Sequence, residues 1–218
     1  MTQYVKSKIR HTAIWRKGEG FAMNYYIADL HLFHKNMTAE GKNLDNRPFE
    51  TIGEMHCAIR ERWNAKVTPK DSVYILGDMS MHSKASELVY FVSSLNGYKY
   101  LIRGNHDKIS NSNYRALYED ICAYKEVKDF YYGEKQRLVL SHYPILMWNH
   151  QHHKSIHLYG HVHNTQEEAY FQKCVREMSW NENGEMIAVN VGCMMPYMDY
   201  TPRTFTEILD GALVSRGK

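Results

Sequence analysis

The chain has no paired cysteines and no long apolar run. Its four cysteines, Cys57, Cys122, Cys174 and Cys193, are scattered, and no two form a C-x-x-C pair. We therefore expect free structural thiols rather than a thiolate zinc site or a disulfide framework. No apolar stretch approaches the ~20 residues that a membrane-spanning helix needs, and residues 2–20 lack the apolar block of a secretory signal. The expected location is the cytoplasm, with no membrane partner.

Strong net charge is also missing. The formal net charge of the chain is +3. Residues 1–20 alone contribute +4, so the remaining residues carry a net charge of about −1. This near-neutral charge does not indicate a surface that binds polyelectrolytes. Nucleic acid is therefore a possible partner but not the favoured one. Residues 1–22 show no clear hydrophobic period, and we expect a basic N-terminal extension followed by one domain over residues 23–218. The extension is either dispensable or a basic arm that touches an anionic substrate.

The chain does contain five polar blocks, each of which follows a short apolar run. The blocks are Asp29-Leu30-His31, Gly77-Asp78, Gly104-Asn105-His106-Asp107, Ser141-His142 and Gly160-His161-Val162-His163. In open α/β sheets the carboxyl ends of the strands face the ligand crevice, so these blocks are expected to meet there. Along an extended backbone, alternation would turn Asp29 and His31 to one side, and likewise His161 and His163.

In this order the blocks resemble the calcineurin-like metallophosphoesterases, whose pattern is D-x-H, G-D, G-N-H-[DE], H and G-H-x-H. The resemblance covers roughly residues 23–210. It implies an α/β fold in which two stacked mixed β-sheets are flanked by helices, an αββα sandwich. Arg47-Pro48-Phe49, followed by a helix that ends in Trp63-Asn64, also resembles a small bacterial and phage branch of this family. That resemblance makes Arg47 a candidate substrate contact.

The resemblance implies two divalent cations that share Asp78. One would be held by Asp29, His31, Asp78 and His163, and the other by Asp78, Asn105, His142 and His161. Carboxylate, amide and imidazole ligands suit several metals; manganese is favoured by the resemblance, while iron, nickel, cobalt and zinc remain open. Two cations ~3.5–4 Å apart lower the pKa of a shared water and clamp phosphoryl oxygens. The implied reaction is phosphoester hydrolysis by attack of a bridging hydroxide.

Three further residues are catalytic candidates. His106 would protonate the departing oxygen, because the unperturbed imidazole pKa of ~6.5 lies near working pH. Asp107 either orients that imidazole or makes a structural hydrogen bond. Arg103 either contacts phosphate bidentately or forms a structural ion pair. Four other histidines are expected to lie outside the ligand set: His34, His150, His152 and His153.

The expected substrate is a small phosphomonoester or phosphodiester, with a nucleotide as one candidate. A metal-dependent nuclease is an alternative, but the near-neutral body and the lack of a basic and aromatic stripe do not favour it. A non-catalytic protein-binding scaffold on the same fold is another alternative, which the intact ligand pattern disfavours. The sequence leaves the oligomeric state open.

Apolar periodicity predicts the elements that carry the blocks. A capping box formed by Thr51 and Glu54 predicts a helix that ends at Asn64. Further helices are predicted at 83–95 and 113–121. Strands are predicted at 25–28, before Asp78, and at 98–102, 123–127, 129–132, 137–140, 156–159, 171–177 and 185–190. Asn183-Gly184 is the expected hairpin turn between the last two.

Overall fold

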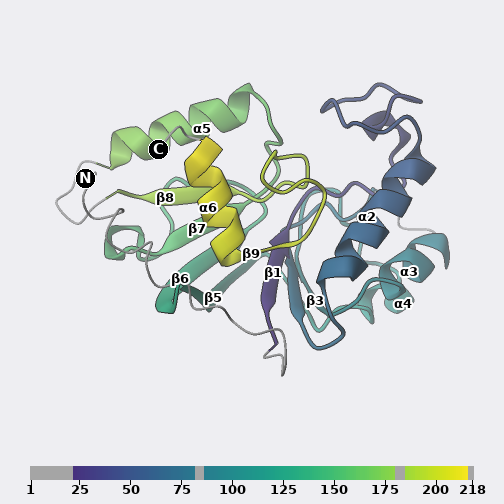
Figure 1. Cartoon of the computed structure of the whole chain (residues 1–218), viewed down its shortest axis with the longest axis horizontal. Helices are drawn as coiled ribbons and strands as arrows, with labels where there is room; N and C mark the ends of the chain where they lie inside the picture. Colours follow the sequence, from purple (N-terminus) through teal and green to yellow (C-terminus); the bar gives the residue numbers. More distant parts are fainter. Residues whose placement is uncertain (1–21, 82–85, 180–184, 216–218) are drawn as a thin grey trace.

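A computed structural model describes residues 22–81, 86–179 and 185–215. Within these ranges the chain forms two mixed β-sheets flanked by helices (Figure 1), which confirms the predicted fold class. Residues 1–21 of the expected basic extension and the predicted turn at Asn183-Gly184 lie outside the described residues. No helix in the described ranges has both the length and the apolar character needed to cross a lipid bilayer.

The first sheet carries the first three polar blocks. In the described part of the chain its order is β4-β3-β2-β1-β9, with β1 to β4 parallel and β9 antiparallel to β1. The bounds are β1 Asn24–Ile27, β2 Ser72–Ile75, β3 Tyr98–Ile102, β4 Asp120–Cys122 and β9 Arg203–Thr204. Parallel strands β1, β2 and β3 therefore end at the same edge, as the motif positions require.

The second sheet carries the remaining two blocks. Its order over the described residues is β5-β6-β7-β8, with an antiparallel β5–β6 hairpin and parallel β6, β7 and β8. The bounds are β5 Tyr124–Tyr131, β6 Glu134–Ser141, β7 Ile156–Tyr159 and β8 Ile187–Asn190. The single strand β5 replaces the two short strands predicted at 123–127 and 129–132. Tyr132 and Gly133, both with positive φ, form the tight turn to β6.

Helices cover the outer sides of the sheets. The α-helices are α2 Ile52–Lys66, α3 Ser86–Ser93, α4 Ser112–Arg115, α5 Gln166–Met178 and α6 Phe205–Ser215, and the short 3-10 helices are η1 Lys35–Met37 and η2 Gln151–His153. Figure 1 shows α2, α3 and α4 beside the first sheet and α5 beside the second. Helix α6 contacts strands of both sheets.

The main core lies between the two sheets. Buried side chains from the first sheet, such as Ile27 and Ile75, share one apolar cluster with Leu140, Leu158 and Val189 of the second. Removing this apolar surface from water is the main favourable term that holds the sheets together. A parallel bridge between Ala28 and Gly192 joins the sheets where β1 ends. The strand ends that carry polar blocks are thereby fixed against each other.

The prediction of a strand at 171–177 is wrong, because this segment lies in helix α5. The Thr165 side chain accepts a hydrogen bond from the Glu167 N–H and caps the helix, and acidic Glu167 and Glu168 occupy its first turn. Phe171 and Val175, four residues apart, form a helical stripe on a second apolar cluster. A short apolar run is compatible with either a strand or a helix, and the capping residue Thr165 favours the helix.

Two other predicted boundaries differ from the structure. Helix α2 begins after Thr51 as predicted but runs to Lys66, two residues beyond Asn64. Asn64 instead uses its side chain to bind Ser94 and Asn96. The predicted helix at 113–121 is limited to α4, because residues 120–122 pair with β3 as strand β4.

Buried His157 on β7 fixes the segment that follows β6. Its Nδ1 donates to the Val139 carbonyl at 3.0 Å, and its Nε2 accepts from the Ile145 N–H at 3.1 Å. A second proton on Nε2 would face the Ile145 N–H, so the fold requires the neutral ring. Burial lowers the pKa of His157 from 6.5 to about 4, although its contacts with the Val139 and Tyr143 backbone raise it.

We expect His157 to make metal-free protein acid-sensitive. In the unfolded chain the ring binds a proton below pH 6.5, whereas in the folded protein it does so only near pH 4. The contribution of His157 to the free energy of unfolding is therefore complete above pH 6.5 and is lost as the pH falls toward 4. The loss should reach about 3 kcal/mol. Urea unfolding of wild type and His157→Gln between pH 8 and 4 measures it: the stability difference should shrink on acidification. Parallel pH profiles would contradict the assignment.

Candidate metal centre

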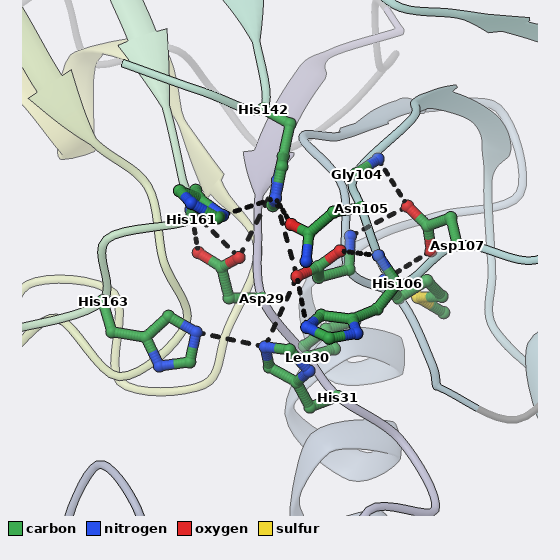
Figure 2. Close-up of polar contacts among 12 residues, drawn as sticks. Asp29, Leu30, His31, Gly104, Asn105, His106, Asp107, His142, His161 and His163 are labelled. Atoms are coloured by element: carbon green, nitrogen blue, oxygen red, sulfur yellow. Dashed lines mark hydrogen bonds and ion pairs between the residues drawn. The ribbon is translucent and has the colours of Figure 1, made fainter.

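The five polar blocks meet at one edge of the two sheets. Each block follows the carboxyl end of a different strand, namely β1, β2, β3, β6 and β7. Figure 2 shows the side chains of Asp29, His31, Asn105, His142, His161 and His163 gathered around a common centre. Asp29, His31, Asp78 and His142 are buried there, whereas Asn105 is exposed and His161 and His163 are partly exposed. The sequence analysis correctly placed the blocks at strand ends.

Left-handed backbone, not an extended strand, turns these side chains inward. Five of the candidate ligands have φ between +48° and +73°: Asp29, His31, Asp78, His161 and His163. Asp and His adopt this region more readily than most residues other than glycine, but it still costs on the order of 1–3 kcal/mol each. The expected extended path through Leu30 is therefore wrong. Backbone bonds from the His31 and Leu32 N–H groups to the Asp78 and Met79 carbonyls hold the two loops together.

Two motif glycines let backbone lie directly against ligand side chains. A Cβ at Gly104 would collide with the Asp78 carboxylate, and a Cβ at Gly77 would collide with the His142 ring. Gly77 also has a φ of +87°, which L-residues with a side chain seldom adopt. These contacts give a physical reason for glycine before Asp78 and before Asn105.

The first ligand group consists of Asp29, His31 and His163, whose ligand atoms lie within 4.8 Å of one another. The Nε2 atoms of His31 and His163 face each other at 3.1 Å. The Asp29 carboxylate lies beside them and accepts hydrogen bonds from the His161 N–H at 3.0 and 3.1 Å. Buried Nδ1 of His31 has no hydrogen-bond partner among the described residues.

The second ligand group consists of Asp78, His142 and His161, again within 4.8 Å. His142 Nε2 lies 3.2 Å from His161 Nδ1 and 2.9 Å from the Asn105 side-chain oxygen. Because Nδ1 of His142 lies 2.9 Å from the Leu76 carbonyl, which can only accept, Nδ1 carries the proton in the neutral ring. The Nε2 lone pair therefore faces the Asn105 oxygen, and the two acceptors repel each other.

Asp78 lies between the two groups. Its Oδ2 is 3.7 Å from His31 Nε2 in the first group and 3.5 Å from His142 Nε2 in the second. Its Oδ1 accepts a hydrogen bond from the His106 N–H at 2.9 Å. One carboxylate oxygen is thus within reach of both sets of imidazoles.

Burial sets the charge state of the ligands. It lowers the pKa of His31, His142 and His161, so these rings are neutral and can offer lone pairs. Burial raises the pKa of Asp29 to about 7. Burial alone would also lower the pKa of His163, but its hydrogen bond to Asp45 and the nearby Asp29 carboxylate raise the pKa above its ordinary value.

The donor set fits divalent cations. Imidazole nitrogens and carboxylate and amide oxygens converge on two points, and a cation at each point would accept their lone pairs. This mixed nitrogen and oxygen set suits first-row divalent metals and does not select one of them.

The comparison with protein families agrees with this geometry. Residues 25–192 match the family model described as calcineurin-like phosphoesterase. The chain belongs to this family. As a calcineurin-like phosphoesterase, it contains all five motif blocks at the strand ends described above, and the two ligand groups are the candidate sites of divalent metal ions.

Relatives of this calcineurin-like phosphoesterase occur in archaea and phages. It is 40% identical to an uncharacterized protein of Methanocaldococcus jannaschii over 85 residues, which are 38% of this chain and 46% of the relative, so the match spans about half of that protein. It is 26% identical to the Gene 66 protein of Mycobacterium phage L5 over 64% of this chain and 77% of the relative. The phage relative agrees with the predicted phage-type branch.

A solved structure shares the fold. A protein of unknown function from Aquifex aeolicus superposes with a TM-score of 0.60 at 23% identity, covering 87% of this chain and 99% of that chain. This similarity supports the two-sheet architecture and carries no information on substrate.

Of the three predicted catalytic residues, His106 and Asp107 lie beside Asp78, and Arg103 contacts Asp107. The His106 side chain is 38% exposed, and its Nε2 is 4.0 Å from Asp78 Oδ2. The Asp107 carboxylate accepts hydrogen bonds from the N–H groups of Asp78, Met79 and Gly104 at 2.8 to 2.9 Å, so the structural alternative accounts for its contacts. Arg103 is exposed, and its Nε donates to the Asp107 carbonyl at 3.4 Å.

Arg47 cannot be the substrate contact that the branch resemblance suggested. Its side chain has no exposed surface, and its guanidinium donates to Asp45 and to the Asp29 and Leu30 carbonyls. Sequence analysis missed Asp45, which also lies 3.0 Å from His163 Nδ1.

A buried asparagine also escaped the sequence analysis. Asn190, at the end of β8, donates from its side chain to the His163 carbonyl at 2.8 Å and accepts from the Gly192 N–H at 2.8 Å. No motif marks it. The loop histidines at positions 150, 152 and 153 are exposed and belong to neither ligand group, as expected. His34 is partly buried and also lies outside both groups.

We expect Asp107→Asn to loosen the loops that carry Asp78 and Asn105. The amide must turn its NH₂ toward at least one buried backbone N–H, and burying such an unpaired group costs about 1–3 kcal/mol. At pH 8, above the value of about 6 to which burial raises the Asp107 pKa, urea unfolding of metal-free protein should show a loss in this range. Asp120→Asn, a partly exposed carboxylate on β4, is the control. Equal stability of Asp107→Asn and wild type would contradict the role.

Proposed function

We propose that this phosphoesterase hydrolyses small phosphomonoesters or phosphodiesters with two divalent cations that share Asp78. The observation that carries the proposal is the position of Asp78 Oδ2 within 3.7 Å of one imidazole from each ligand group. Bound cations would lower the pKa of a water molecule and clamp the phosphoryl oxygens. Manganese is the proposed metal, on the strength of the family and the nitrogen and oxygen ligands.

Different residues would hold the cations and supply the proton. Asp29, His31 and His163 would hold one cation, His142, His161 and Asn105 the other, and Asp78 both. His106 would place a proton on the departing oxygen, because its half-exposed ring stands beside Asp78 where a substrate would enter. Its backbone N–H binds Asp78 Oδ1, so the acid and the shared ligand are held in one unit.

An exposed aromatic ring beside the ligands favours substrates with an aromatic group. The Tyr143 side chain is about half exposed, and its ring centroid is 4.5 Å from that of His161 and 5.0 Å from that of His142. Such a ring can stack on a nucleobase or an aryl group. This supports a nucleotide among the candidate substrates. The near-neutral body supports a small nucleotide over a nucleic-acid chain.

The proposal is tested with manganese-reconstituted protein and a panel of aryl monoesters and diesters, cyclic nucleotides, dinucleoside polyphosphates and single-stranded DNA. We expect turnover of small esters that chelator abolishes and manganese restores. Turnover of DNA alone would support the nuclease alternative. Protein that takes up no manganese and hydrolyses nothing would overturn the proposal in favour of a scaffold.

We expect His106→Ala to retain both cations but to slow substrates with poor leaving groups. Loss of a general acid typically costs 10²–10⁴-fold, and an aryl oxide of low pKa needs that proton least. The measurement is kcat against leaving-group pKa, with metal content from elemental analysis. His150→Ala, an exposed loop histidine outside both ligand groups, is the control. The same slope for wild type and His106→Ala would remove the acid role.

A further inference from the structure

A buried ion pair outside the ligand set reaches the first ligand group. Asp45 and Arg47 lie on the loop between η1 and α2, and their side chains are only 3% and 0% exposed. Asn43 fixes this loop, because its side chain binds both the N–H and the carbonyl of Arg47. Arg47 is also 5.8 Å from the centre of the Tyr200 ring, which lies over its guanidinium. The pair is thus held rigidly.

Arg47 binds the backbone of the first polar block, Asp29-Leu30-His31. Its Nη2 donates to the Asp29 carbonyl and its Nη1 to the Leu30 carbonyl, each at 2.9 Å. These two carbonyls flank the left-handed turn that carries Asp29 and His31 toward the centre. The planar fork of an arginine can bind both carbonyls and Asp45 at once, which a lysine cannot do.

Asp45 holds the third member of the same group. Arg47 Nε donates to Asp45 at 2.9 Å, and His163 Nδ1 donates to Asp45 Oδ2 at 3.0 Å. Because Nδ1 carries the proton, the lone pair is on Nε2, the atom that faces His31. A carboxylate behind a ligand histidine fixes both the tautomer and the ring direction.

The second ligand group has no contact with this pair among the described residues. His142 is oriented by the Leu76 carbonyl, and the loop that carries Asp78 is held by Asp107. The ion pair therefore acts on one half of the centre.

We propose that Asp45 and Arg47 form a positioning clamp that sets the affinity of the cation held by Asp29, His31 and His163, with little effect on the other cation. The proposal rests on the two-cation site of the proposed function but not on hydrolysis. Loss of such a partner typically weakens metal binding 10–100-fold. The clamp makes the two metal positions unequal and dependent on a loop between η1 and α2.

The test is manganese titration of chelator-stripped protein by calorimetry, with electron paramagnetic resonance to distinguish a coupled ion pair from isolated ions. Two variants are compared with wild type. Asp45→Asn removes the charge that faces His163. The double variant Asp45→Ala with Arg47→Met removes both charges, so it leaves no buried charge unpaired, as a single change would.

Wild type should bind two ions and show the coupled signal. Both variants should bind one ion with wild-type affinity and the other 10–100-fold more weakly, and isolated-ion signals should appear at limiting manganese. Asp71→Asn is the control: Asp71 is also buried and binds the backbone N–H groups of Met23 and Thr68, but touches no candidate ligand among the described residues.

Each result has one meaning. Two ions bound with wild-type affinity in both variants would overturn the clamp. So would an equal loss in Asp71→Asn, which would trace the effect to general stability. Failure of wild type to bind two ions would instead overturn the two-cation centre of the proposed function.

Discussion

The constraint on which the site depends is the mutual repulsion of its ligand atoms. Imidazole nitrogens and carboxylate oxygens from four strand ends, with the Asn105 amide oxygen from a fifth, are crowded around Asp78 with little water to screen them. A buried polar group without a partner is costly. Left-handed backbone at five of these residues adds strain. The fold must therefore supply enough stability elsewhere to hold the ligands in place, and bound cations would recover part of that cost.

The stability comes from the junction of the two sheets. The shared apolar core fixes the strand ends, and two buried carboxylates then fix the loops that extend from them. Asp107 ties the Asp78 loop to Gly104, and Asp45 with Arg47 ties the Asp29 loop to His163. Asp107 acts on the shared residue Asp78, and Asp45 acts on the first ligand group. This arrangement separates the candidate metal ligands from the residues that orient them.

Much of this organisation could be predicted from the sequence, because short apolar runs that end in polar blocks mark strands and their carboxyl ends. The strands at 98–102 and 156–159 have the predicted bounds, and the motif residues meet as expected. Segment 171–177 was predicted wrongly, since its apolar spacing is compatible with either period and the cap at Thr165 was overlooked. Asp45 and Asn190 act only through tertiary contacts that no local pattern encodes. The left-handed turns were missed because Asp and His tolerate that region without requiring it.

The most direct measurement is anomalous X-ray scattering from crystals of the protein grown with manganese. Two peaks should appear ~3.5–4 Å apart, with the Asp78 carboxylate coordinating both, His31 and His163 on one, and His142 and His161 on the other. A single peak, or two peaks of which only one contacts Asp78, would contradict the shared carboxylate.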